Sequence, residues 1–258
     1  MLTLKLLAPV KHENFKKCSQ SGFCKRNRAF ADDVSAKGSS WSSPYELDRS
    51  TIQFENGRLQ GTILKSISPS EKVKLSLVIS FLESGVARVT VDEEKRITGD
   101  IEVRHGSPAR KQRYNDAQSW VLVGGLDTSR SATLSADTKN EVSTVSYGPD
   151  NTYQAVIRHS PFSVDFQRDG QTHVQFNHKG YFNMEHWRQN VEAPAEGEQD
   201  VLGSQEDEST WWEETFGGNT DSKPRGPESV GLDISFPGYK HVFGIPEHAD
   251  SMSLRETR

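Results

Sequence analysis

This sequence has little of what marks several large classes of protein. Its 258 residues include only two cysteines, Cys18 and Cys24, too few for a disulfide-built scaffold or an all-cysteine zinc site. No uninterrupted apolar stretch approaches the ~20 residues that a membrane-spanning helix needs. The 31 Lys and Arg residues are outnumbered by 36 Asp and Glu, whereas binding a nucleic-acid backbone needs a concentrated basic excess. The composition therefore excludes a membrane-spanning helix and argues against a protein devoted to nucleic acid.

Short motifs that carry catalytic or cofactor chemistry are missing as well. The sequence contains no G-x-S-x-G, no Walker-type phosphate loop, no H-E-x-x-H and no G-x-G-x-x-G. The pairs His173 with His178 and His241 with His248 do not match a common metal-ligand spacing. We therefore expect no metal and no cofactor, and we favour structural or surface roles for these histidines. Carboxylates are plentiful, but sequence separation does not show which of them lie close together.

What the sequence does contain is a series of short strand patterns. Ser50–Glu55 alternates apolar and polar side chains, and the following Asn56-Gly57 predicts a tight hairpin. Val73–Leu82 and Val86–Val91 alternate in the same way across a short turn and predict a second hairpin. Further strands are expected at Trp120–Val123, Ala132–Ser135, Val142–Tyr147, Tyr153–Ile157, Phe162–Phe166 and His173–Phe176.

This regular spacing of strands bears on the class of fold. Turn residues separate the strands, and the only helix pattern is a weak one near Ala29–Ala36. Strands that do not alternate with helices of comparable length favour an antiparallel sandwich or barrel over a parallel sheet. The sequence therefore predicts a mainly β protein.

Two segments of unbalanced charge flank the strands. The first thirty residues hold seven Lys and Arg against one acid, Glu13. We interpret them as an arm that lies on an acidic part of the same protein, with a nucleic-acid patch as the less favoured alternative. Residues 189–222 hold ten acids and no Lys or Arg, which predicts a disordered insert over roughly 191–209. Trp211, Trp212 and Phe216 then predict that the end of this tract docks on something.

The last segment, from Gly231 to Asp250, is dense in glycine, proline and aromatic residues. Such a composition is typical of loops beside a site or an interface. Its composition makes Glu247, His248 and Asp250 site-adjacent candidates, although hydrogen bonds that hold the loop are the favoured interpretation. The cysteines also leave two alternatives open at this point, a small disulfide-closed loop or two unrelated thiols.

Several strings of residues, in order along the chain, resemble one known family. They are Lys11–Cys18, Gly22–Arg28, Arg88–Glu93, Pro161–Asp165, Trp212–Phe216, Asp221–Pro224, Gly226-Pro227, Ser229–Asp233 and His241–Asp250. Over residues 10–257 the chain is similar to the glycan-processing α-glucosidases of glycoside hydrolase family 31. The resemblance implies a β-sandwich of galactose-mutarotase-like type, followed in the whole enzyme by a (β/α)8 barrel with two catalytic Asp residues. This sequence has no counterpart of those two residues, so it offers none as catalytic.

The resemblance implies further properties. It implies residence in the lumen of the endoplasmic reticulum and, in that oxidising compartment, a disulfide between Cys18 and Cys24. It implies that the acidic tract is a variable insert, and that the substrate is the α-1,3-linked glucose of glucosylated N-linked glycans. The implied partners are the catalytic barrel portion and a separate β subunit. The turn that carries Gly244, Glu247 and His248 is the candidate nearest to the sugar pocket.

Together these inferences predict the organisation and function of the chain. We expect a basic arm over residues 1–48, a sandwich over 49–188, an acidic insert over 189–210 and a return segment over 211–258. The predicted function is that of a non-catalytic front portion that buttresses the barrel. The alternative is a free-standing carbohydrate-binding or scaffolding module. The side chains expected to pack on the barrel are large aromatics: Trp211, Trp212, Phe216, Phe236, Tyr239 and Phe243.

Overall fold

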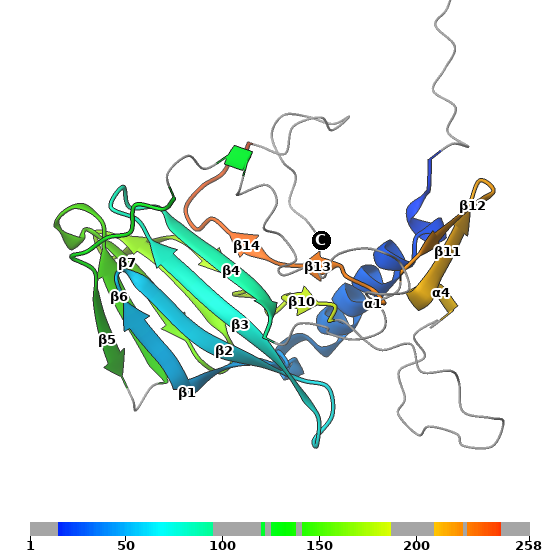
Figure 1. Ribbon diagram of the computed structural model, residues 1–258, viewed down its shortest axis with the longest axis horizontal. Coiled ribbons are helices and arrows are strands. Elements are labelled where there is room, and N and C mark those ends of the chain that lie inside the picture. Colours follow the sequence, from blue (N-terminus) through cyan, green and yellow to red (C-terminus); the bar gives the residue numbers. More distant parts are fainter. Residues whose placement is uncertain are drawn as a thin grey trace, which may run out of the picture. The chain divides into compact units, whose positions relative to one another are not determined.

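The computed structural model describes residues 15–94, 120–121, 125–137, 141–186, 209–223 and 226–243, which form two compact units (Figure 1). Of the described residues, unit 1 contains 15–41, 183–186, 209–223 and 226–231, and unit 2 contains the rest. Among the helices of these described ranges, none is long and apolar enough to cross a membrane.

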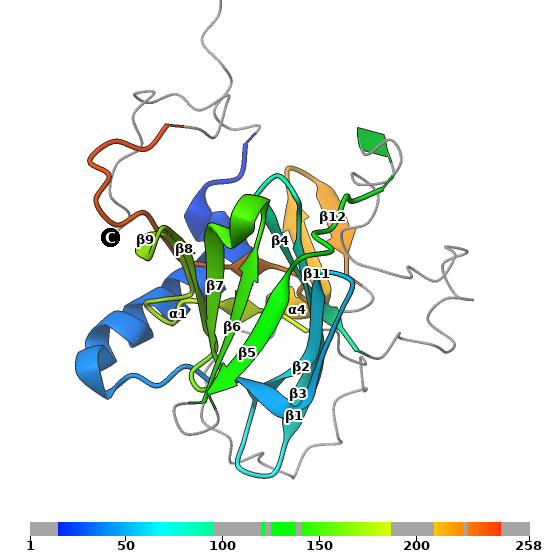
Figure 2. The same cartoon turned by 90° about the vertical axis from the view of Figure 1, so that its left-hand side faces the viewer.

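Unit 2 is a sandwich of two antiparallel sheets, which Figure 2 shows as separate layers. The first sheet has the order β1-β2-β3-β4, with β1 at Tyr45–Glu55, β2 at Arg58–Ser66, β3 at Lys72–Phe81 and β4 at Ala87–Glu93. The second has the order β14-β9-β8-β7-β6-β5. Its strands are β5 Thr133–Asp137, β6 Val142–Tyr147, β7 Tyr153–Arg158, β8 Ser163–Arg168, β9 Gln171–Phe176 and β14 Ile234–Ser235, with a 3-10 turn, η4, at Pro149–Asn151. The predicted mainly β, antiparallel sandwich is confirmed.

The hairpin predicted at Asn56-Gly57 joins β1 to β2. Asn56 and Gly57 have φ values of 50° and 67°, the two positive angles of the tight turn that matches strand twist. The Gly57 carbonyl accepts a hydrogen bond from the Phe81 amide at 2.9 Å. A Cβ atom on Gly57 would lie only 2.4 Å from the Ser129 carbonyl oxygen. Glycine is therefore required here both by the turn and by the close approach of another loop.

The core fills the space between the two sheets because apolar side chains alternate along each strand. In the first sheet the fully buried residues are Leu59, Ile63, Leu75, Leu77, Ile79 and Phe81. The second contributes Val145, Tyr147, Ala155, Ile157 and Val164, and the Phe81 and Tyr147 rings meet with centroids 4.8 Å apart. Each such aliphatic side chain contributes about 1.5–3 kcal/mol on burial, so this alternation stabilises the sandwich.

Most of the predicted strands are confirmed to within two residues at each end, but two local predictions differ from the structure. Trp120 and Val121, expected to begin a strand, are helical and strongly exposed, while Leu122 and Val123 lie outside the described residues. Periodicity alone does not distinguish a short apolar strand from a helical turn. The β1 strand starts at Tyr45, five residues earlier than predicted, because Tyr45 and Leu47 are buried in the core.

Unit 1 is built from the two charged segments. Its helices are η2 at Cys18–Gln20, α1 at Gly22–Lys37, η3 at Gly38–Ser40 and α4 at Ser209–Trp212. Two short antiparallel pairs complete it, β11 Glu213–Phe216 with β12 Asn219–Ser222, and β10 Asn183–Met184 with β13 Val230–Gly231. The predicted helix at Ala29–Ala36 lies within α1, which is longer.

The domain boundaries expected from composition do not coincide with the division into units. Residues 42–48 belong with the sandwich, and residues 183–186 and 211–231 fall in unit 1. Most of the acidic insert expected at 189–210, and the turn with Gly244, Glu247 and His248, lie outside the described residues. The expected boundaries were drawn from composition and charge, whereas the two units are defined by which segments are in contact.

Candidate functional site

Three exposed aromatic side chains follow β14 on the sandwich. Phe236, Tyr239 and Phe243 are 40%, 56% and 66% exposed, and we call them the aromatic face. The strand before them is paired to β9, with Ile234 opposite Phe176. The backbone at its start is fixed by Asp233, whose carboxylate accepts the amide hydrogens of Lys179 and Tyr181 at 2.8 and 2.9 Å. The aromatic face therefore begins at a firmly held point of the sheet.

Two hollows adjoin the aromatic face. One of about 410 Å³ is lined by Gly85, Ala87, Tyr147, Tyr153, Phe166, Gln167, Arg168, His173, Val174 and Tyr239. The other, of about 280 Å³, is lined by His173, Val174, Phe236, Tyr239, His241, Val242 and Phe243. Tyr239 and His173 belong to both, and the Tyr239 hydroxyl lies 2.7 Å from His173 Nδ1. This pair stands between the hollows and gives Tyr239 a defined position despite its exposure.

The chemistry of the two hollows is aromatic and weakly polar. Arg168 places its guanidinium 5.7 Å from the centre of the Tyr153 ring, and Gln167 donates to Thr172 Oγ1 at 3.3 Å. Among the described residues that line either hollow there is no Asp or Glu. Such a surface can pack against apolar side chains or a sugar ring. The described lining residues do not include the pair of carboxyl groups that a glycosidase uses.

The six aromatic residues predicted to pack on a barrel fall into two groups. Phe236, Tyr239 and Phe243 come together around the smaller hollow of unit 2. Trp211, Trp212 and Phe216 belong to α4 and β11 of unit 1 and are half-buried. The Trp212 carbonyl accepts the Lys223 amide at 2.6 Å, and Phe216 lies under Lys16 Nζ at 5.9 Å.

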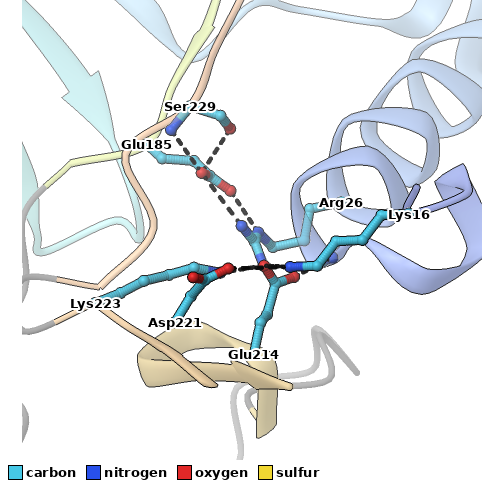
Figure 3. A network of polar contacts seen from close by, with 8 residues as sticks. Lys16, Arg26, Glu185, Glu214, Asp221, Lys223 and Ser229 are labelled. Carbon is cyan, nitrogen blue, oxygen red and sulfur yellow. Dashed lines mark hydrogen bonds and ion pairs between the residues drawn. The ribbon is translucent and has the colours of Figure 1, made fainter. Parts of the chain in front are cut away.

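Unit 1 contains a network of charged side chains around two poorly exposed carboxylates, Glu185 and Glu214, which Figure 3 shows from close by. Glu185 receives Arg26 Nε at 2.5 Å, and the side chains of this pair are only 8–9% exposed. Ser229 donates its hydroxyl and its amide to the same carboxylate at 2.5 and 2.9 Å. Burial raises the pKa of Glu185, but the Arg26 and Ser229 donors outweigh it and the pKa lies below its ordinary value.

Glu214 is the second centre of this network. Lys223 Nζ and Lys16 Nζ approach its Oε2 at 2.8 and 3.5 Å, and the Gly22 amide donates to its Oε1. Lys16 also reaches Asp221 at 3.2 Å. Burial raises the pKa of Glu214, whereas Lys223, Gly22 and Lys16 lower it, with a net decrease. The expectation that the basic arm lies on an acidic part of the same chain is confirmed for these residues.

Sequence analysis did not predict the partners in this network. Arg26 and Glu185 are 159 residues apart, and Gly22 and Glu214 are 192 apart. The available signal was only the opposite charge of the two segments, which does not select individual pairs. Beside these contacts, Cys18 and Cys24 are joined in a disulfide with their Cα atoms 5.2 Å apart. Among the described residues no group of three His, Cys, Asp or Glu side chains is arranged to hold a metal ion.

Comparison with known proteins identifies the family. A sequence model of the glycosyl hydrolase 31 N-terminal galactose mutarotase-like domain matches residues 76–258. The chain belongs to this family. The glycosyl hydrolase 31 domain accounts for the antiparallel sheets described above, and the predicted galactose-mutarotase-like fold class is confirmed.

Related proteins and structures agree with this assignment. The chain is 33% identical to glucosidase 2 subunit alpha of Schizosaccharomyces pombe over 245 residues, which cover 94% of this chain and 25% of that protein. It is 32% identical to neutral alpha-glucosidase AB of Mus musculus over 268 residues, covering 96% and 25%. A crystal structure of a glucosidase II alpha subunit bound to Glc1Man2 is 54% identical, with a TM-score of 0.81, covering 95% and 25%.

A further similar structure is the heterodimeric complex of ER glucosidase II, which consists of the catalytic subunit and the binding domain of the regulatory subunit. It aligns at 54% identity with a TM-score of 0.80 and again covers 95% of this chain and 25% of that chain. This glycosyl hydrolase 31 chain thus spans about a quarter of the length of the relatives that it matches.

Proposed function

We propose that this chain is the non-catalytic N-terminal portion of a retaining α-glucosidase that removes α-1,3-linked glucose from N-linked glycans. In this proposal the sandwich buttresses a (β/α)8 catalytic barrel and helps to shape its sugar pocket. The assembled enzyme acts in the lumen of the endoplasmic reticulum and pairs with the glucosidase II β subunit.

The observation that carries the proposal is the aromatic face on a sandwich of this family. Large aromatic side chains at 40–66% exposure, gathered beside two hollows, are typical of a surface that another protein surface covers. The matched relatives are about four times as long as this chain. The remaining polypeptide of such a protein is therefore the partner that we propose for this face.

The carboxylates of the chain support a non-catalytic role. A retaining glycosidase needs two carboxyl groups about 5–5.5 Å apart beside the sugar. Neither hollow has one among its described lining residues. Three carboxylates whose side chains are at most 10% exposed, Asp165, Glu185 and Glu214, each pair with a basic side chain of the same protein, Arg158 in the case of Asp165. Their charges therefore form ion pairs that stabilise the fold.

Two features support the lumenal location and the position of the pocket. The Cys18–Cys24 disulfide fits an oxidising compartment. The turn with Gly244, Glu247 and His248 follows directly after Phe243 in the sequence, so we propose that it borders the sugar pocket beside the aromatic face.

The test is complementation of hydrolysis. The purified chain is assayed with p-nitrophenyl α-glucoside alone and after mixing or co-expression with the barrel-bearing polypeptide of a relative. We expect no activity alone and activity from the combination. Phe243→Ser with Tyr239→Ser should reduce complementation at least tenfold, because loss of two buried aromatics at an interface costs more than about 1.4 kcal/mol. Ile67→Ser, at a 43% exposed apolar residue of the same sandwich, is the matched control and should complement normally.

Hydrolysis by the chain alone would overturn the non-catalytic assignment. The competing function, a free-standing carbohydrate-binding module, is favoured by the Tyr239–His173 pair between the hollows. It predicts saturable binding of a linear α-glucan by the chain alone, lost in Tyr239→Ser, together with no complementation.

A further inference from the structure

We propose that the Cys18–Cys24 disulfide is a redox-sensitive lock on unit 1. It holds Lys16, Gly22 and Arg26 in the positions from which they bind Glu185, Glu214 and Asp221. Reduction of the disulfide releases these contacts and loosens unit 1 while the sandwich stays folded. This inference does not depend on the proposed function.

The contacts of the N-terminal segment with Glu185, Glu214 and Asp221 cluster around the disulfide in the sequence. The disulfide closes a seven-residue ring, Cys18 to Cys24. Gly22 lies inside the ring and donates its amide to Glu214. Lys16 and Arg26 lie two residues outside it on either side and form the ion pairs with Glu214, Asp221 and Glu185. We call these the anchor contacts, and all of them lie within two residues of a cysteine.

The local backbone depends on the same ring. The Cys18–Gln20 turn and the first three residues of α1 lie within it, and the Ser21 amide donates to the Cys18 carbonyl at 3.1 Å. The Gly22 amide is one of the free donors of the first helical turn. Its direction toward Glu214 is therefore set by a turn that the disulfide closes.

Apolar burial contributes little to the described part of unit 1. Seventeen apolar residues of the described chain are buried, and only Val34 and Met184 of these belong to unit 1. Apolar burial is the main stabilising contribution in most folded units. In the described part of unit 1 the polar anchor contacts and the covalent ring contribute a larger share of the stability. Loss of the ring should therefore destabilise unit 1 and not the sandwich.

The disulfide is accessible to a reductant. Both cysteines are of intermediate exposure, so a small dithiol can reach them. One thiolate of the dithiol attacks a cysteine sulfur, the S–S bond breaks and the other cysteine leaves as a thiolate. The second thiol of the reductant then resolves the mixed disulfide. The products are two protein thiols and the oxidised, cyclic reductant.

The two sides of the contact differ after reduction. Glu185 keeps the Ser229 hydroxyl and amide, and Glu214 keeps Lys223 at 2.8 Å. Ser229 and Lys223 belong to the same stretch of unit 1 as the two carboxylates, residues 183–231, and not to the N-terminal segment. The N-terminal segment loses the ring that positions Lys16, Gly22 and Arg26. The structure therefore separates at the anchor contacts.

The experiment is hydrogen exchange of the purified chain at pH 7, with and without dithiothreitol, followed by mass spectrometry. Thiol labelling verifies that both cysteines are reduced. We expect peptides of α1 and of β11–β12 to exchange faster by on the order of tenfold or more, as loss of a small disulfide-closed ring implies. Peptides of β2 and β3 serve as the internal reference and should not change.

Variants separate the lock from a general loss of stability. Cys18→Ser with Cys24→Ser should reproduce the fast exchange without dithiothreitol and show no further response to it. Arg26→Met should release α1 with the disulfide intact, whereas Lys37→Met, which breaks the exposed Lys37–Asp33 pair of the same helix, should not. If the double variant does not fold, hydrogen exchange of the folded wild-type chain after reduction still tests the inference.

Three results would overturn the inference. The first is reduction that leaves the exchange of β11–β12 unchanged, which would make the disulfide a local link within the N-terminal segment. The second is equal acceleration in β2 and β3, which would mean global unfolding. The third is resistance of the folded chain to dithiothreitol.

Discussion

At the scale of single residues, His159 is a buried base at the junction of the two sheets. It is 4% exposed, and its Nε2 lies 2.9 Å from Ser143 Oγ. Its backbone carbonyl accepts the Leu47 amide of β1 at 2.8 Å, and its amide donates to the Glu141 carbonyl. Burial lowers the pKa of His159, Glu141 raises it and Arg49 lowers it, with a net decrease. The folded protein therefore holds this imidazole neutral where the unfolded chain would take up a proton.

This difference predicts a pH dependence of stability. The unfolded chain binds the proton near pH 6.5 and the folded chain only at lower pH. The free energy of unfolding of the sandwich should therefore fall as the pH drops below about 6.5, by at most about 1.4 kcal/mol per pH unit. Urea titrations followed by far-UV circular dichroism between pH 7.5 and 5.5 measure it.

The matched controls for this prediction are two histidine variants. His159→Gln keeps a group that can reach Ser143 and should flatten the profile. His178→Gln, at an exposed histidine, should leave it unchanged. A profile that stays steep in His159→Gln would assign the effect to other groups.

At the scale of elements, the two-residue turns test how much local geometry stabilises the sheets. The turn Asn56-Gly57 and the turn Asp169-Gly170 both have two positive φ angles. A Cβ on Gly57 meets the Ser129 backbone at 2.4 Å, whereas a Cβ on Gly170 has nothing within 4 Å. Both glycines therefore need a positive φ, but only at Gly57 is there no room for a Cβ atom.

Gly57→Ala should destabilise the protein more than Gly170→Ala. The positive φ costs about 1 kcal/mol in either variant. The collision of Gly57→Ala with Ser129 adds about 1–3 kcal/mol for moving a packed backbone. The free energy of unfolding from urea titration measures both. Equal losses in the two variants would show that the Ser129 loop moves aside without cost.

The elements also show which parts of the structure were predictable. The Asn56-Gly57 hairpin and the strand at Val142–Tyr147 were readable because a turn and an alternating pattern lie within a few neighbouring residues. The start of β1 was missed because the alternation of Tyr45 and Leu47 does not continue to Ile52: the apolar positions change from odd to even where the β1–β2 register shifts. The pairing of Arg26 with Glu185 was missed because no local signal joins residues 159 positions apart.

The candidate site was predictable to a similar extent. Composition singled out Phe236, Tyr239 and Phe243, which the structure leaves exposed around one hollow. It did not show that Trp211 and Trp212 belong to a different unit. It also gave no indication that His173 of β9 contacts Tyr239, a contact that depends on the pairing of β14 with that strand.

At the scale of the whole molecule, the two units differ in what stabilises them. Fifteen of the seventeen buried apolar residues of the described chain are in unit 2. Unit 1 depends more on Glu185 and Glu214, whose pKa values lie below the ordinary 4.5. Carboxylates of this kind contribute stability above the pKa of the unfolded chain and lose it as pH falls through the folded pKa.

We therefore expect unfolding that is not two-state. Trp41, Trp211 and Trp212 lie in unit 1, so tryptophan fluorescence should change at a lower urea concentration than the far-UV circular dichroism of the sheets. The gap should widen as pH falls below about 4.5, because Glu185 and Glu214 become protonated more readily in the unfolded chain. Coincident transitions at pH 7 and at pH 4 would show that the units unfold together.

The segment 183–231 leaves the sandwich and returns to it at residues that are direct partners, because Asn183 lies opposite Gly231 in the β10–β13 pair. Cα atoms of such partners are about 4.5–5.5 Å apart. A detour whose two ends meet can lengthen or shorten during evolution without shifting the register of either sheet. The acidic residues of 189–222 lie within this segment of the sequence, so a change in their number need not disturb the pairing of either sheet.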